Sequence, residues 1–250
     1  MSMNKAKSIA ALLPMIWMSG TSFADSPSTV IPVPSPLKKF MPKLHREKLE
    51  EAKNKKIDFV MIGDSITHSW SKYPGVFDGS NLLNLGFPGD RTQNVLWRIR
   101  NGALDGISPK LVTLMIGTNN LHGDKKAYPP DKPEDIFAGI QTIVAEVREC
   151  LPKSKIVVFS IFPRKAGPAY ERVKAVNALL PQLANDNPNI HHLNINGLFL
   201  NDKGFQNQFL FDRDLLHLNK QSYQTWTQSL KPVLEKHGLK INPNTLRKND

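Results

Sequence analysis

The chain of 250 residues contains one cysteine, and this scarcity excludes the simplest covalent stabilisation. A single thiol, Cys150, cannot form an intramolecular disulfide, so the core has to stabilise the fold. Cys150 follows an apolar helical pattern, and we expect it to be buried rather than reactive. Metal ligands are also sparse, because the nearest pair, His191 and His192, are neighbours whose side chains point to opposite faces of an extended segment. We therefore expect neither a bound metal nor a cofactor.

Long apolar runs are absent after residue 24, and a membrane-spanning helix needs about 20 apolar residues. We therefore expect no stable membrane span in that part of the chain. Residues 1–24 have the layout of a secretory signal peptide, with Lys5 and Lys7, an apolar run over 9–18 and small residues up to Ala24. We expect cleavage after Ala24 and a periplasmic or secreted location, with an uncleaved anchor as the alternative.

Acidic residues are few, since 22 Asp and Glu stand against 33 Lys and Arg, a net charge of +11. Removing residues 1–24 takes away two lysines and no acids, which leaves 250 − 24 = 226 residues with a charge of +11 − 2 = +9. That length suits one domain. The surplus attracts anionic surfaces and polyanionic substrates. It does not indicate nucleic acid as a partner, because the basic residues are scattered and do not alternate with aromatic ones.

Proline spacing and periodicity divide the chain. Four prolines within ten residues predict a linker over 25–41 that is extended and poorly ordered. We expect the folded domain to cover 42–240 and a polar tail to cover 241–250. Short apolar runs predict five strands, at 57–62, 82–85, 111–116, 156–161 and 190–195. Helical patterns occupy about 42–56, 91–102, 136–147, 173–183 (with Pro181 as a local irregularity) and 220–236.

Continuous apolar strands that alternate with amphipathic helices predict an α/β fold, with a parallel sheet covered on both faces. Ligands of such sheets bind beyond the carboxyl ends of the strands. Ser65 follows the first predicted strand, Gly89 follows the second and Asn119 follows the third. Their positions at strand ends were not part of the criterion that singled them out, so the agreement supports a site there.

Each of these residues has a simple structural explanation when taken alone. Ser65 in Gly63-Asp64-Ser65 can cap a helix, Gly89 can serve a turn, and Asn119 can form an Asx turn. Asp214 and His217, three residues apart, can be a surface pair. Together and in this order they supply a nucleophilic hydroxyl, a base, an orienting acid and oxyanion donors, which is the set that acyl transfer requires.

The positions of these residues also allow them to act as acid, base, nucleophile and oxyanion donors. Residues three apart in a turn can share a face, so Asp214 can accept the Nδ1–H of His217. The Nε2 of His217 is then free to accept the proton of Ser65. Glycine at position 89 lets a backbone N–H approach an oxygen without a Cβ in the way. The sequence therefore predicts a serine esterase that forms an acyl-Ser65 intermediate.

The chain resembles the SGNH (GDSL-type) hydrolase superfamily and, within it, the catalytic subunits of platelet-activating factor acetylhydrolase and their bacterial relatives. The resemblance implies a three-layer α/β/α flavodoxin-like fold with a five-stranded parallel sheet. It implies that Ser65 is the nucleophile, His217 the general base and Asp214 its orienting acid. It implies an oxyanion hole made by the N–H groups of Ser65 and Gly89 and the amide of Asn119. It extends from residue 37 to 234 and is densest at 63–67, 84–92, 95–98, 117–120 and 214–218.

Three features depart from the pattern of those subunits. Pro88 predicts a stiffer loop before Gly89. Residues 123–133 are expected to be an insertion after the Asn119 block that borders the substrate pocket. The export signal makes platelet-activating factor itself an unsuitable natural substrate. His68 and His122 are expected to be packing or loop residues, and Arg91, Trp97 and Arg98 are expected to stabilise the helix behind the site.

Three functions remain open from the sequence. The first is an exported esterase that removes short acyl groups, acetyl above all, from a carbohydrate or lipid alcohol. The second is a lysophospholipase or thioesterase for longer chains. The third is a non-catalytic protein whose basic surface binds acidic glycans. The expected partner is a small-molecule, glycan or lipid ester, and the chain is expected to be a monomer or a homodimer.

Overall fold

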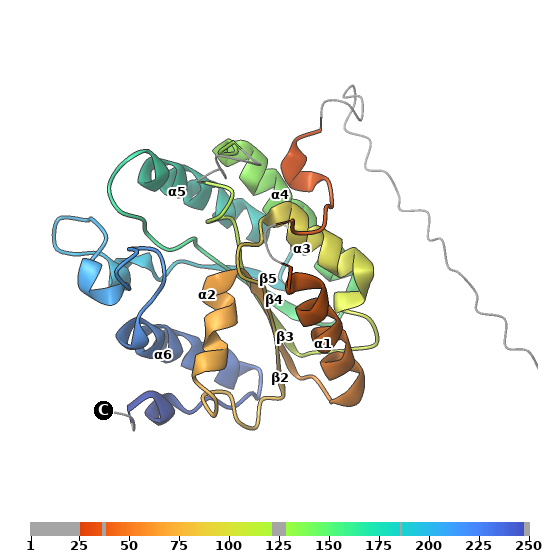
Figure 1. Cartoon of the computed structure of the whole chain (residues 1–250). Helices are drawn as coiled ribbons and strands as arrows, with labels where there is room; N and C mark the ends of the chain where they lie inside the picture. Colours follow the sequence, from red (N-terminus) through yellow and green to blue (C-terminus); the bar gives the residue numbers. More distant parts are fainter. Residues whose placement is uncertain (1–25, 37–38, 122–128, 186, 248–250) are drawn as a thin grey trace, which may run out of the picture.

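A computed structural model describes residues 26–36, 39–121, 129–185 and 187–247 (Figure 1). The predicted signal peptide, His122 and residues 123–128 of the predicted insertion lie outside the described residues. The sheet has five strands in the order β2-β1-β3-β4-β5, and every neighbouring pair is parallel. The predicted five-stranded parallel sheet is therefore confirmed. The strands are β1 (Phe59–Gly63), β2 (Leu82–Gly86), β3 (Leu111–Met115), β4 (Lys155–Phe159) and β5 (Ile190–Leu193).

Helices cover both faces of the sheet, which confirms the three-layer α/β/α arrangement (Figure 1). Helices α1, α3, α4 and α5 lie on one face, and α2 and α6 lie on the other. None of the helices in the described ranges is long and apolar enough to span a membrane. Their bounds are α1 (Met41–Asn54), α2 (Ser65–His68), α3 (Thr92–Arg98), α4 (Pro133–Cys150), α5 (Pro168–Leu179) and α6 (Lys220–Lys236).

Burial on both faces explains why the strands are continuously apolar. All five residues of β1 are buried. Phe59 and Met61 point into the core beneath α2 and α6, whereas Val60 and Ile62 point into the core beneath the other four helices. Successive side chains of a strand point to opposite faces, so a strand between two helical layers needs an apolar residue at every position.

The core beneath α6 is aromatic, and it holds α2 in place. The rings of Trp70 and Tyr223 have centroids 4.7 Å apart, and those of Trp70 and Trp226 have centroids 5.2 Å apart. The Tyr223 hydroxyl donates to the carbonyl oxygen of Ile66 in α2, at 2.6 Å. Helix α6 thereby fixes a helix of only four residues, which would not be stable by itself.

The prediction of a poorly ordered linker is wrong for residues 28–33. Thr29 is buried, and its hydroxyl donates to the carbonyl oxygen of Asp135 at 2.6 Å. The Thr92 hydroxyl donates to the Thr29 carbonyl at 3.0 Å, and the Asn94 amide donates to the carbonyl of Val33 at 3.0 Å. These contacts with α3 and α4 are far away in sequence, so proline spacing alone could not predict them.

The C-terminal end of the predicted domain and the predicted burial of Cys150 also need correction. Residues Pro243–Arg247 form a short 3-10 helix, in which Leu246 is buried beside α6 and its carbonyl accepts from Gln224 at 2.9 Å. Packing therefore extends beyond residue 240. The prediction that Cys150 is buried is wrong as well, because this last residue of α4 is exposed. Partial covering and the nearby carboxylates, Glu146 first among them, raise the pKa of its thiol, which disfavours the reactive thiolate.

Close packing of α2 against β2 requires a glycine at the end of that strand. A Cβ on Gly86 would lie 2.2 Å from the backbone nitrogen of His68 and 2.7 Å from the carbonyl carbon of Thr67. The Asn84 amide donates to the Thr67 carbonyl at 3.1 Å, and its oxygen accepts from the Gly86 N–H at 2.9 Å. The end of β2 thus fixes the helix that begins at Ser65.

We expect Gly86→Ala to lower the free energy of unfolding by about 1–3 kcal/mol, because the added methyl group meets backbone that cannot move aside cheaply. Urea denaturation followed by tryptophan fluorescence measures the loss. Gly197→Ala is the matched control, since a Cβ there meets nothing within 4 Å, and its effect should stay within about 0.5 kcal/mol. Equal stability of the two variants would contradict the packing argument.

Candidate active site

The structure brings together the three side chains that the sequence singled out for acyl transfer. The Oγ of Ser65 lies 2.8 Å from Nε2 of His217, and Nδ1 of His217 lies 2.6 Å from Oδ2 of Asp214. A carboxylate can only accept, so Nδ1 carries the proton and Nε2 accepts from the Ser65 hydroxyl. A hydroxyl, an imidazole and a carboxylate are therefore joined by two hydrogen bonds, as the spacing predicted.

Ser65 is fixed by the turn between β1 and α2. It is the first residue of α2, and Asp64 caps the helix by accepting from the Ile66 N–H at 2.9 Å. Asp64 is fully buried, and its Oδ2 makes no hydrogen bond within the described chain. Burial raises the pKa of Asp64 to about 7, although the cap hydrogen bond and the nearby cationic groups oppose the shift. The serine therefore lies on a short and rigid connection.

Asp214 and His217 are held by a tight loop. Phe211 and Leu218 form an antiparallel bridge, and the Asp212 N–H donates to the His217 carbonyl at 2.8 Å. Leu215, between the acid and the base, has a φ of +53°, which is uncommon for a residue other than glycine. We call residues 211–218 the catalytic loop.

The loop also stabilises the charge of Asp214. Its Oδ1 accepts from the N–H groups of Leu216 and His217, each at 2.9 Å. Partial burial would raise the pKa of Asp214, but these bonds and the bond from the His217 side chain outweigh it and lower the pKa to about 2. Asp214 is therefore an anion at any pH near neutrality.

The loops after β2 and β3 contain the predicted oxyanion donors. Asp90 N–H donates to the carbonyl of Phe87 at 3.0 Å, and Gly89 has a φ of +87°. Proline in second place and a left-handed glycine in third place are typical of a type II turn, so Pro88 and Gly89 suit their positions. The Gly89 N–H makes no hydrogen bond to the part of the chain that the structure describes.

Asn119 is tied to this turn. Its side-chain amide donates to the carbonyl of Asp90 at 2.9 Å, which uses one N–H and leaves the other for a ligand. The loops after β1, β2 and β3 are adjacent in the sheet, so Ser65, Gly89 and Asn119 follow three neighbouring strands. Their role as donors to an oxyanion remains a prediction.

A buried ion pair fixes the Gly89 turn from behind. Arg98 donates from Nε and Nη2 to the two carboxylate oxygens of Asp90, at 2.6 and 2.9 Å. Its guanidinium also lies 3.5 Å over the ring of Phe87. Burial raises the pKa of Asp90 to about 6, and the ion pair opposes that shift. Arg98 was expected to stabilise the helix behind the site, and the structure shows that it anchors the Gly89 turn through Asp90.

The residues beside Asn119 connect the site to α3 and to the end of the predicted insertion. Asn120 accepts from the Thr92 N–H at 3.1 Å and donates to Asp131 at 2.9 Å. Arg91 lies 3.6 Å from the same carboxylate of Asp131. The Nδ1 of His68 lies 3.2 Å from the Gly86 carbonyl oxygen, in agreement with a packing role.

Sequence reasoning missed Arg164. It follows β4, is only 8% exposed and donates to the Thr118 hydroxyl at 3.1 Å. It makes no ion pair within the described residues, although the charges of Asp64 and Asp214 both act on it. Burial lowers the pKa of Arg164 to about 10, although these two carboxylates oppose the shift. Its place after Pro163, at the carboxyl end of a strand, was the available signal.

The arrangement suits nucleophilic chemistry. No group of three His, Cys, Asp or Glu side chains among them could hold a metal ion. What the site does contain is a hydroxyl bonded to an imidazole, which is in turn bonded to an ionised carboxylate. Such a set can attack an acyl carbon and pass a proton to the leaving group.

Comparisons with known proteins agree with this geometry. A profile of the GDSL-like lipase/acylhydrolase family matches residues 61–225. Human platelet-activating factor acetylhydrolase IB subunit alpha1 is 32% identical over 197 residues, which cover 76% of this chain and 81% of that protein.

Two solved structures share the fold. A GDSL-like lipase from Bacteroides thetaiotaomicron gives a TM-score of 0.64 at 22% identity, over 76% of this chain and 96% of its own. A carbohydrate acetylesterase from Sinorhizobium meliloti gives a TM-score of 0.57 at 18% identity, over 72% of this chain and 99% of its own. These matches confirm the resemblance drawn from the sequence. Because the family profile covers more than half of the chain, the protein belongs to the GDSL-like lipase/acylhydrolase family and is a carboxylic ester hydrolase.

Proposed function

We propose that the chain is an exported serine esterase that removes short acyl groups, acetyl above all, from a carbohydrate or lipid alcohol. The observation that supports it most is the pair of hydrogen bonds that link Ser65 to His217 and His217 to Asp214. A surface pair would not place Nε2 at 2.8 Å from a hydroxyl that is 152 residues away in the sequence.

In the first half of the reaction, Ser65 Oγ bonds to the acyl carbon while its proton passes to Nε2 of His217. The carbonyl electron pair moves to the oxygen, where the N–H groups of Ser65 and Gly89 and the Asn119 amide donate to it. Losing one such donor typically costs about 3–4 kcal/mol of transition-state stabilisation. The bond to the alcohol oxygen then breaks, and His217 returns the proton to that oxygen.

In the second half, water attacks the acyl-Ser65 carbon. His217 takes a proton from this water and gives it to Ser65 Oγ as the acid leaves. The Asp214 carboxylate stabilises the imidazolium at each stage, and the low pKa of Asp214 keeps it ionised there. The enzyme ends as it began, with the ester and one water converted to acid and alcohol.

Two relatives support acetyl as the acyl group. One is named for platelet-activating factor acetylhydrolase and the other for carbohydrate acetylesterase, so acetyl removal is common to both names. Export is a separate part of the proposal, and it rests on Lys5, Lys7 and the apolar run over 9–18. An exported enzyme would meet glycans and lipids rather than cytosolic metabolites.

A longer-chain lipase is the second candidate, because the family includes lipases. Hydrolysis of p-nitrophenyl esters from C2 to C12 distinguishes the two. We expect kcat/KM to be highest for the C2 ester and to fall steadily as the chain grows. An optimum at C8 or longer would favour the lysophospholipase or thioesterase instead.

We expect Ser65→Ala to lower kcat for p-nitrophenyl acetate by a factor on the order of 10³ or more, because the nucleophile is lost. Circular dichroism should show an unchanged fold, since the side chain makes only the bond to His217. A fluorophosphonate probe should label the natural chain and leave the variant unlabelled. Full activity in the variant would refute the role of Ser65, and an unlabelled, inactive natural chain would favour the glycan-binding protein.

We expect kcat/KM for p-nitrophenyl acetate to fall on acidification across roughly pH 8 to 5, where imidazoles take up a proton. Asp214 cannot cause this fall, because its pKa is lowered to about 2. Folding lowers the pKa of Asp214, so this carboxylate adds to the free energy of unfolding at every pH above its ordinary pKa. That contribution is lost only as the pH falls toward 2. A pH–rate profile that is flat across the imidazole range would argue against a histidine base.

A further inference from the structure

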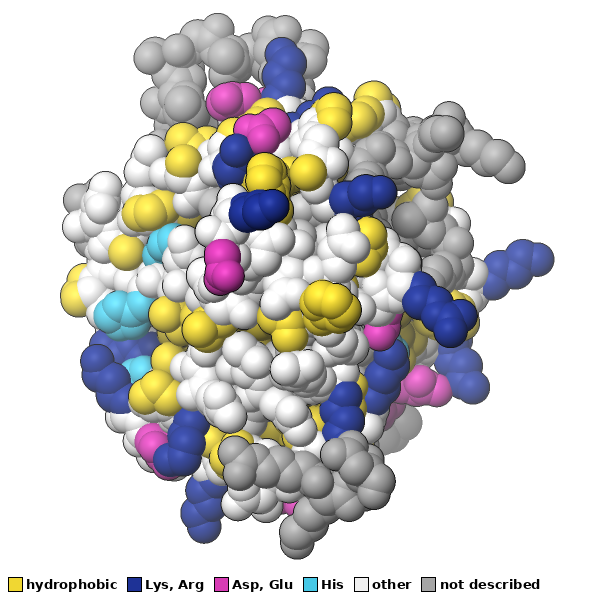
Figure 2. Space-filling model, turned by 90° about the vertical axis from the view of Figure 1, so that its left-hand side faces the viewer, with side chains coloured by type: hydrophobic (Ala, Val, Ile, Leu, Met, Phe, Trp, Pro, Cys, Tyr) yellow, Lys and Arg dark blue, Asp and Glu magenta, His cyan; other side chains and the backbone are white. Residues whose placement is uncertain are grey.

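Exposed aromatic rings gather in the segment that follows β5. Phe209 is 88% exposed, Phe205 is 48% exposed and Leu198 is 53% exposed. In Figure 1 this segment (light blue) lies at the left edge, and Figure 2, which views the molecule from that side, shows a band of hydrophobic side chains across this face with Lys and Arg beside it. Large apolar side chains gathered on one face indicate a binding surface.

These rings border an open cleft of about 680 Å³. One wall of the cleft is the segment that contains Phe205 and Phe209, and a second is formed by Lys165 and Ala166 from the loop after β4. The third wall is residues 211–213 and 215 of the catalytic loop, which also contains Asp214 and His217. The cleft therefore shares a wall with the loop that contains Asp214 and His217.

The buried side chain of Gln206 holds the three walls together. Its amide donates to the carbonyls of Pro163 and Leu215, each at 3.0 Å. Its other polar atom, Oε1, is buried and has no hydrogen-bond partner within the described chain. Gln206 lines the cleft, and its two hydrogen bonds fix the shape of the cleft wall.

The charged groups of the cleft favour an anion. Lys165 and Arg213 are exposed, and neither forms an ion pair with any residue that the structure describes. Asp212 is the single acid among the lining residues, so the cations exceed the acids by 2 − 1 = 1. Exposed amides of Asn201 and Gln208 add hydrogen-bonding capacity. Rings, amides and cations together fit a sugar chain that carries carboxylates.

We propose that this cleft is a subsite for an anionic glycan, which binds the sugar residues next to the one whose ester is cleaved. Phe209 and Phe205 lie against sugar faces, and Arg213 and Lys165 pair with carboxylates. The proposal deepens the proposed function, on which it rests, by assigning the alcohol part of the ester to an acidic polysaccharide. A lipid surface is the competing occupant, and the exposed amides of Asn201 and Gln208 and the acid Asp212 in the lining disfavour it.

Binding can be tested without turnover in the full-length chain with Ser65→Ala. The probe is O-acetylated polygalacturonate, and isothermal titration gives its dissociation constant. We expect Arg213→Gln and Phe209→Ala, each added to Ser65→Ala, to weaken binding by about fivefold or more. We also expect binding to weaken as NaCl is raised, because exposed charges are screened.

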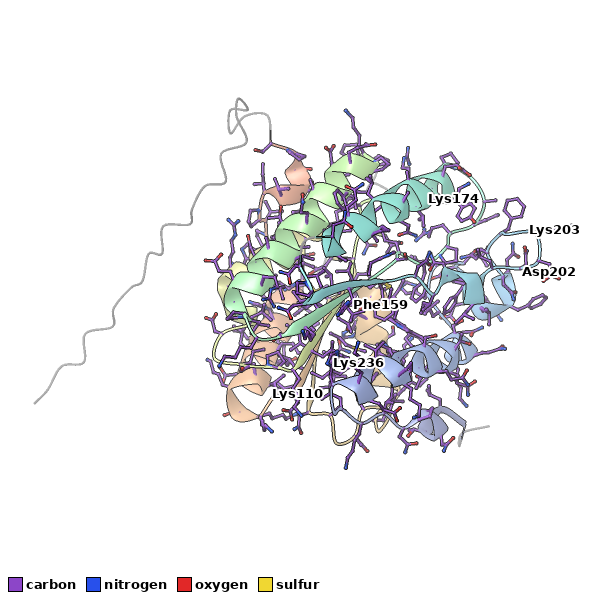
Figure 3. The ribbon with its side chains drawn as sticks, turned by 180° about the vertical axis from the view of Figure 1, so that it is seen from behind. Lys110, Phe159, Lys174, Asp202, Lys203 and Lys236 are labelled. Carbon is purple, nitrogen blue, oxygen red and sulfur yellow. The ribbon has the colours of Figure 1, made fainter. Side chains whose placement is uncertain are left out.

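Two matched controls test whether the cleft itself is responsible. Lys203 is an exposed cation in the segment that also contains Phe205 and Phe209. It lies at the outer end of that segment, beside Asp202 and away from Phe159 in the sheet (Figure 3). Phe40 has a ring as exposed as that of Phe205, at 49%, but it lies before α1. Neither residue lines the cleft, so Lys203→Gln and Phe40→Ala should each change the dissociation constant by less than about twofold.

Three results would overturn the subsite. Equal losses for Arg213→Gln and Lys203→Gln would indicate diffuse surface charge. O-acetylated xylan, which is neutral, binding as tightly as the polygalacturonate would exclude a role for carboxylates. Binding to phosphatidylglycerol vesicles in place of the glycan would assign the face to a lipid surface. The catalytic proposal is tested separately by p-nitrophenyl acetate, so failure of either can be recognised without the other.

Discussion

The hydrogen bond between His217 and Ser65 joins two parts of the chain that are 152 residues apart, and the site depends on it. Ser65 takes its position from the turn after β1, whereas His217 takes its position from the catalytic loop before α6. The Tyr223 hydroxyl links α6 to the helix of Ser65 through the Ile66 carbonyl. Packing between α2 and α6 therefore sets the distance between the imidazole and the hydroxyl.

Burying ionisable groups near the active site costs free energy of folding, and only some of these groups form ion pairs. Asp90 and Arg98 form a two-bond ion pair that compensates for their burial. Asp64 and Arg164 each make one hydrogen bond within the described residues, and burial shifts both pKa values toward the neutral forms. Such unpaired groups are rarely retained for stability, and they concentrate where a protein does chemistry.

Periodicity predicted most of the fold, because strand and helix patterns are local. The helix over 220–236 has the predicted bounds, and Pro181 lies in a 3-10 turn, Leu180–Ala184, after α5. The grouping of Ser65, Asp214 and His217 was predictable because their residue types and order are those that acyl transfer requires. The contacts of Thr29 and Arg164 were not predictable, since they are made with residues that are distant in the sequence. Cys150 was placed wrongly because a helical period does not say where the covering layer ends.

The catalytic loop lines the cleft and also contains Asp214 and His217, so a ligand bound in the proposed subsite would affect the reaction. Leu215 lines the cleft, and it lies between the acid and the base of the triad with its carbonyl held by Gln206. A glycan in the cleft would press on the same loop that orients the imidazole. Binding energy from sugar residues that do not react could then restrain His217 in the geometry of attack, which is how remote contacts raise kcat as well as lower KM. A small ester leaves the cleft empty, so it draws on the triad and the oxyanion donors alone.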